Sequence, residues 1–174
     1  RFSLYYFFAF GGFVALALWL PRYLIGVYGF DIETAGMVAA AYSIPGSIFR
    51  AYGGFLSDRK GARSVMYCMF VVAAVTTGIL SFSIKPAVFV ASIFVLGFVM
   101  SLGKAAVYKH IPVYYPKNVG AVGGLVGMIG GGRGFGLPIS FGELNDLNGL
   151  WINCFMLLFV LVRVPTPWID FFIL

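Results

Sequence analysis

The feature that most constrains this chain is a succession of long apolar segments that carry almost no charge. A helix needs about 20 mostly apolar residues to cross the hydrocarbon core of a bilayer, and residues 2–20 reach that length without a charged side chain. Over the whole chain 61% of residues are hydrophobic and only 10% are charged, whereas about a quarter are charged in a soluble domain. Too few charges remain to cover a water-facing surface, so lipid must be the solvent for much of the protein.

The spacing of the apolar segments predicts an all-α integral membrane protein with six transmembrane helices. Asp31 and Glu33 suit the N-terminus of the second helix, and Pro86 suits the first turn of the fourth. The last apolar segment reaches spanning length only if residues 145–149 join it. An atypical tail is expected over residues 163–174. The predicted helices cover residues 2–28, 34–56, 64–84, 86–113, 119–141 and 145–162.

The basic residues predict the orientation of the helices. If the N-terminus is cytoplasmic, eight lysines and arginines fall on the cytoplasmic side and only Arg22 and Lys85 fall on the other side. This bias predicts a multi-pass protein of the inner (plasma) membrane with both ends in the cytoplasm, which requires an even number of spans. Topology therefore explains the net charge of +6, and no nucleic acid is expected as a partner because no basic stripe with interleaved aromatic residues is present.

Catalytic and metal-binding patterns are absent from the sequence. Cys68 and Cys154 lie inside apolar segments without a CxxC motif, and the chain has a single histidine, His110. This composition predicts buried thiols rather than a metal site. No nucleophile stands beside a base in a pattern that would suggest catalysis. The expected protein is not an enzyme and needs no cofactor.

A charged segment separates the second and third apolar segments. Residues 53–63 read Gly-Gly-Phe-Leu-Ser-Asp-Arg-Lys-Gly-Ala-Arg, a tight basic turn in which Asp58 is expected to pair with Arg59, Arg63 or a helix N-terminus. The string resembles the G-x-L-a-D-r-x-G-r-r motif of the major facilitator superfamily, which stands between the second and third helices of a six-helix half. The resemblance implies two such halves, alternating access by rocking of one against the other, and a gating role for Gly54, Asp58, Arg59, Gly61 and Arg63.

Arg50 lies within the second apolar segment, about 10 Å before Ser57 at a helical rise of about 1.5 Å per residue. An arginine buried in a membrane costs at least ~2.5 kcal/mol and indicates a functional site. Its charge is balanced either by extension of the side chain toward Ser57, by the other half of the protein, or by an anionic substrate. A guanidinium group suits a small planar oxyanion. All six acids lie at or near segment ends: Asp31, Glu33, Asp58, Glu143, Asp146 and Asp170.

Three stretches resemble the second half of the nitrate/nitrite porter family within that superfamily. Residues 6–13 are similar to the seventh helix of the family, and the aromatic pair that lines its substrate site maps onto Tyr6 and Phe10. Residues 49–54 match the eighth helix, so the substrate-binding arginine of the family falls on Arg50. The run 120–138 is similar to the nitrate signature of the eleventh helix, with its glycines at Gly123, Gly124, Gly127, Gly130, Gly131 and Gly134.

This second resemblance covers residues 1–162 and implies a nitrate or nitrite substrate and an N-terminal six-helix half as partner. Two departures from the family pattern are Gly132-Arg133 and the tail after Val162. Two alternatives stay open: a superfamily transporter for another small solute, since the substrate is implied only by the resemblance, and a degenerate, inactive fragment, which the two departures favour. The glycine spacing alone also fits tight helix packing. Lys104 is interpreted as marking the cytoplasmic side, with attraction of anions to the cytoplasmic mouth as the alternative.

Overall fold

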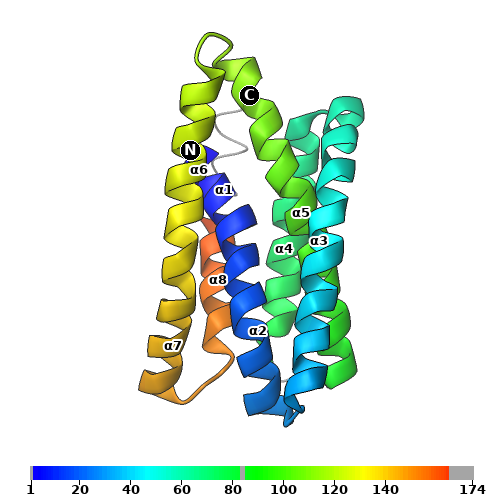
Figure 1. Cartoon of the computed structure of the whole chain (residues 1–174), viewed down its shortest axis with the longest axis vertical. Helices are drawn as coiled ribbons and strands as arrows, with labels where there is room; N and C mark the ends of the chain where they lie inside the picture. Colours follow the sequence, from blue (N-terminus) through cyan, green and yellow to red (C-terminus); the bar gives the residue numbers. More distant parts are fainter. Residues whose placement is uncertain (1, 83–84, 165–174) are drawn as a thin grey trace.

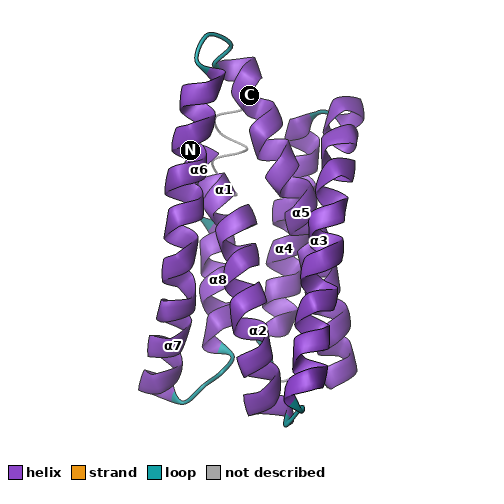
Figure 2. Cartoon of the chain, in the orientation of Figure 1, coloured by secondary structure: helices purple, strands orange, loops and turns teal. Residues whose placement is uncertain are grey.

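The computed structural model describes residues 2–82 and 85–164, and every regular element in these residues is helical (Figure 2). The helices form six rods. Two of the rods contain an irregular turn, namely the π-helical turn η1 (Phe7–Gly12) and the 3₁₀ turn η2 (Arg133–Phe135). The rods are α1 (Phe2–Tyr6), η1 and α2 (Phe13–Tyr28); α3 (Ile32–Lys60); α4 (Ala62–Leu80); α5 (Pro86–Tyr114); α6 (Val119–Gly132), η2 and α7 (Gly136–Asn148); and α8 (Asn153–Arg163).

Three of these rods are long and apolar enough to cross a membrane: Phe2–Tyr28, Ala62–Leu80 and Pro86–Tyr114. The rod α3 has 29 residues, but it carries charges at both ends and many small residues, which lower its mean hydropathy. The last helix, α8, is apolar and shorter. Most of the predicted tail, from residue 165 onward, lies outside the described residues.

Helix α3 begins and ends at residues with clear physical signals. The Asp31 carboxylate accepts hydrogen bonds from the Thr34 backbone N–H (3.1 Å) and the Thr34 hydroxyl (2.6 Å), and this cap starts the helix at Ile32 rather than at residue 34. At its other end, Gly61 with a φ of 83° is the one residue between α3 and α4. The predicted loop over residues 53–63 is therefore mostly helix, with a sharp corner at Gly61.

The predicted boundary between the fifth and sixth helices is wrong. Residues 145–148, assigned to the sixth helix, continue the fifth rod, which runs to Asn148 rather than ending at residue 141. Gly149 adopts the left-handed conformation with a φ of 65° and ends α7, because glycine takes this conformation without steric strain. The next helix begins at Asn153. Similarly, α4 ends at Leu80, before the predicted limit at residue 84.

Successive rods run in opposite directions, so the α3–α4 corner and the α5–α6 connection lie at the end of the bundle where α1 begins (Figure 1). The α1–α2 rod lies between the α6–α7 rod on one side and α3 and α5 on the other, and α8 packs directly against α4. Two close backbone approaches hold this arrangement. A Cβ at Gly53 would lie 2.7 Å from the Leu102 Cα, and a Cβ at Gly134 would lie 2.6 Å from the Gly11 Cα.

Candidate substrate site

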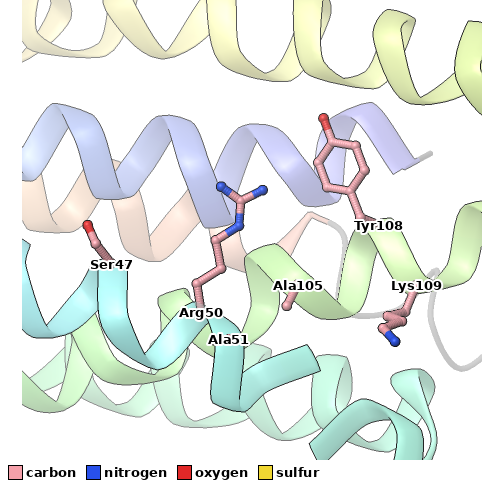
Figure 3. Close-up of a pocket in the computed structure, with 6 residues that line it drawn as sticks. All are labelled: Ser47, Arg50, Ala51, Ala105, Tyr108 and Lys109. Atoms are coloured by element: carbon pink, nitrogen blue, oxygen red, sulfur yellow. The ribbon is translucent and has the colours of Figure 1, made fainter. Parts of the chain in front are cut away.

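An open hollow of about 580 Å³ lies between α3 and α5. Figure 3 shows the Arg50 side chain crossing from α3 toward α1, while Tyr108 extends from α5 toward α6. Arg50 is exposed on this open side of the bundle. No ion pair joins it to an acid within residues 2–82 and 85–164. The hollow is lined by Ser47, Arg50, Ala51, Ala105, Tyr108 and Lys109.

Arg50 and Tyr6, two of the predicted site residues, lie near each other in the structure. The Arg50 guanidinium interacts electrostatically with the hydroxyl of Tyr6, whose side chain is buried. The rings of Tyr6 and Phe10 stack with centroids 5.1 Å apart and planes 3° apart. Tyr108 meets Tyr6 edge-on, at 5.0 Å and 89°. Tyr6, Phe10 and Tyr108, called here the aromatic cluster, form one wall beside the guanidinium.

The π-helical turn η1 follows Tyr6 and contains Phe10. A π-helical turn is wider than an α-helical one and is frequent at functional sites. Its glycines, Gly11 and Gly12, let the rod pass close to its neighbours: a Cβ at Gly11 would lie 3.0 Å from the Gly134 Cα. The first rod therefore has both an irregular turn and a close crossing with the α6–α7 rod at the level of the aromatic cluster.

Four glycines of α6 face this cluster. A Cβ at Gly127 would lie 2.9 Å from the Tyr108 hydroxyl oxygen, and one at Gly130 would lie 2.8 Å from the Tyr6 ring. At Gly123 and Gly131 the nearest atoms belong to Tyr108 and Phe10, at ordinary contact distances of 3.7 and 3.5 Å. These glycines leave space for aromatic side chains, which the spacing alone did not reveal.

Gly124, predicted to belong to the site, has other surroundings. A Cβ at Gly124 would have no other atom within 4 Å, so this glycine faces open space. On α3, Gly46 is covered by the Phe13 ring, which would lie 2.5 Å from a Cβ there. Arg133 begins the 3₁₀ turn η2, where the fifth rod changes from α6 to α7.

The partner of Asp58 differs from the prediction. Its carboxylate accepts hydrogen bonds from the Lys109 ammonium on α5, at 2.7 and 2.8 Å, rather than pairing with a neighbour on its own loop. Gly54 lies beneath this lysine, with the Lys109 Cε 4.0 Å from the place that a Cβ would take. Arg59 places its guanidinium 4.7 Å from the Phe55 ring centroid. Arg63 is exposed in the first turn of α4.

Lys104 is the residue whose position the sequence did not predict. It is 3% exposed, and its ammonium lies 3.0 Å from the Phe13 ring centroid and 5.9 Å from that of Phe10. It stands ten residues before the end of α5 at Tyr114, about 15 Å along a helix. Two features of the sequence indicated this position: the depth of Lys104 within the helix, and its place one turn before Tyr108 on the same helix face.

The site thus combines cations, hydroxyl groups and aromatic faces. Arg50 and Lys104 lie close enough to repel each other, and in the described part of the chain neither forms an ion pair with an acid. No three His, Cys, Asp or Glu side chains of those residues form a metal-binding group. An arrangement of this kind attracts an anion, because a negative charge relieves the repulsion between the two cations.

Comparison with known proteins gives a consistent result. The sequence profile described as Major Facilitator Superfamily matches residues 2–167. A protein of Thermus thermophilus named "Probable nitrate/nitrite antiporter NarK1" is 40% identical over 193 aligned positions, which cover 100% of this chain and 44% of that protein.

More distant relatives carry related names. The "Probable nitrate transporter NarT" of Staphylococcus haemolyticus is 34% identical, over 90% of this chain and 40% of that protein. The "Nitrite extrusion protein" of Bacillus subtilis is 32% identical, again over 90% of this chain and 40% of that protein. The chain therefore spans about two fifths of the length of these relatives.

Proposed function

The chain belongs to the Major Facilitator Superfamily, and from this membership we propose that it is the second six-helix half of a secondary transporter for nitrate or nitrite. The superfamily consists of membrane transporters and not of enzymes. All six rods would span the membrane, packed against an N-terminal six-helix half. Both ends of the chain would lie in the cytoplasm, as the distribution of basic residues favours.

The observation that carries the proposal is the placement of Arg50 beside Tyr6 in an open hollow. A guanidinium group presents paired donors in one plane, which match two oxygens of a planar anion. The Tyr6 hydroxyl adds a donor from the side, and the stacked ring of Phe10 supports the Tyr6 ring. The names of the relatives direct the choice among small oxyanions to nitrate and nitrite.

The open side of the hollow agrees with a two-half architecture. Arg50 is exposed there, and a charged residue within a membrane protein normally faces a bundle interior or a water-filled cavity. A second half packed on this side would enclose the anion between the halves near the midplane. Rocking of the halves would then expose the anion to either side in turn.

Uptake into proteoliposomes tests this proposal. The protein used is the two-half protein, in which this chain is joined to an N-terminal six-helix half of the same family. We expect nitrate and nitrite uptake, and we expect Arg50→Lys to reduce it by roughly tenfold or more, because lysine keeps the charge and loses the planar pair of donors. Arg22→Lys is the matched control, since Arg22 stacks on Trp19, away from the hollow, and should leave uptake unchanged.

The other outcomes separate the alternatives. Equal uptake by wild type and Arg50→Lys would remove Arg50 from the anion site. Uptake of a different solute in place of nitrate and nitrite would identify a superfamily transporter of another specificity. A folded wild-type protein that moves neither ion nor any other small anion would identify an inactive remnant.

A further inference from the structure

We propose that Lys104 is a second cationic residue of the substrate site and that it binds the anion jointly with Arg50. The inference rests on the proposed function in one respect, since it requires an anion at Arg50. It does not depend on whether that anion is nitrate, nitrite or another small oxyanion.

The charge of Lys104 is buried. The side chain is 3% exposed, and no acid pairs with it in the part of the chain that the structure describes. The neighbouring lysine on the same helix behaves differently, because Lys109 is half-exposed and paired with Asp58. Charged residues inside membrane bundles are rare and mark substrate or ion pathways. Lys104 therefore has the burial of a site residue and lacks the acidic partner of a structural one.

Aromatic rings hold the Lys104 ammonium in place. The Lys104 Nζ lies 3.0 Å from the Phe13 ring centroid. Phe13 is fixed in turn by stacking on Tyr42, at 4.8 Å and 25°, and its ring fills the space that Gly46 leaves on α3. Cation–π attraction offsets only part of the cost of removing an ammonium group from water. The rings thus position the charge and leave it without a full counter-charge.

Phe10 and Tyr6 connect Lys104 to the site. The Lys104 ammonium lies 5.9 Å from the Phe10 ring centroid, and the Phe10 ring stacks on the ring of Tyr6. The Tyr6 hydroxyl interacts electrostatically with Arg50. Arg50 thus acts on Tyr6 and Lys104 lies beside Phe10, so the two cations are near the same aromatic pair and repel each other. One turn beyond Lys104, Tyr108 lines the hollow.

The two cations determine what the site should recognise. Two cations with no acid between them make the empty site unfavourable, and one monovalent anion near Arg50 is attracted by both. Because Lys104 acts through its charge rather than through shape, it should increase the affinity for all small anions alike. Arg50, with its planar donors, should instead distinguish among them.

The test compares Lys104→Met, which removes the charge and keeps the length, with Lys104→Arg, which keeps the charge. The two-half protein is assayed for nitrate and nitrite uptake, and KM and kcat are measured separately. We expect Lys104→Met to raise KM for both ions by roughly tenfold, and Lys104→Arg to keep KM within about threefold of wild type. Lys117→Met, in the exposed α5–α6 connection, removes one charge outside the hollow and should leave KM unchanged.

An unchanged KM in folded Lys104→Met would overturn the inference, since a packing role needs only the apolar stem of the side chain. If Lys104→Met does not fold, Lys104→Gln takes its place. A KM that is raised in Lys104→Gln but not in Lys104→Arg supports the inference. An equal KM in the two variants overturns it. If wild type carries another anion but not nitrate or nitrite, the same comparison is made with that anion. The nitrate assignment then fails, while the role of Lys104 is still decided.

Discussion

Asp58, near the end of α3, accepts two hydrogen bonds from Lys109 on α5, at 2.7 and 2.8 Å. The pair joins the helix that carries Arg50 to the helix that carries Lys104 and Tyr108, on the side of the bundle where the chain turns at Gly61. Both side chains are largely exposed, at 60% for Asp58 and 45% for Lys109. An exposed ion pair contributes little to stability, typically about 0–1 kcal/mol, and we therefore expect this pair to act in the motion of the helices.

We expect Asp58→Asn to change transport much more than stability. The substitution removes the charge that holds Lys109, and the melting temperature of the two-half protein should fall by only about 2–4 °C, if at all, because the pair is solvated. The rate of nitrate uptake should change severalfold, while KM for nitrate stays near its wild-type value. Lys109→Met should give the same change. A double variant no worse than either single variant would show that the two residues act as a pair.

Tyr6→Phe should weaken anion binding without loosening the bundle. The ring still stacks on Phe10 at the same place, and only the hydroxyl next to Arg50 is lost. In the proposed site this hydroxyl donates a hydrogen bond to the anion. A hydrogen bond to a charged group contributes about 1.5–3 kcal/mol, so KM for nitrate should rise roughly tenfold or more. Tyr23→Phe is the control, because Tyr23 packs against Phe89 outside the hollow. A Tyr6→Phe protein with wild-type KM would remove the hydroxyl from the site.

The sequence was informative where a chemical pattern is local. The apolar segments predicted the helical membrane bundle, and short strings that resemble family motifs pointed to Arg50, Tyr6 and Phe10, the first two of which lie near each other in the structure. The corner at Gly61 and the cap at Asp31 also depend on neighbouring residues. Such features can be predicted because the residues that determine them are adjacent in the chain.

Features that depend on contacts between distant segments were missed. The partner of Asp58 lies on α5, far along the chain, and nothing near residue 58 indicates it. Lys104 was grouped with the cytoplasmic basic residues, because the counting of lysines by side ignores depth along a 29-residue helix. The boundary near residue 145 was misplaced because a left-handed glycine at 149 is decided by backbone conformation, which composition does not show.

Asp31 offers a prediction for pH dependence. Hydrogen bonds from the side chain and backbone of Thr34 hold the pKa of this carboxyl below its usual value of 3.8. A carboxyl with a lowered pKa stabilises the folded state above its unfolded pKa, and this contribution is lost as the pH falls through the folded pKa. The cap should therefore stay ionised at pH 4 and weaken only in stronger acid. Carbon NMR of labelled Asp31 checks this, with Thr34→Val expected to move the pKa upward and with an unchanged value contradicting the account.

Gly134→Ala and Gly124→Ala should have opposite effects, although both glycines belong to the same predicted run. A Cβ at Gly134 would lie 2.6 Å from the Gly11 Cα, and backbone atoms cannot yield as a flexible side chain does. The two rods must move apart, at a cost of about 1–3 kcal/mol as for other overpacked contacts, and the displacement also shifts η1 and its Phe10. A Cβ at Gly124 would meet nothing within 4 Å, so alanine there should be neutral or should stabilise α6 by up to ~1 kcal/mol through helix propensity. Thermal unfolding and nitrate uptake of the two variants, measured together, check this. Equal losses in both would mean that the glycines act through backbone flexibility along the whole of α6 rather than through the single close crossing at Gly11.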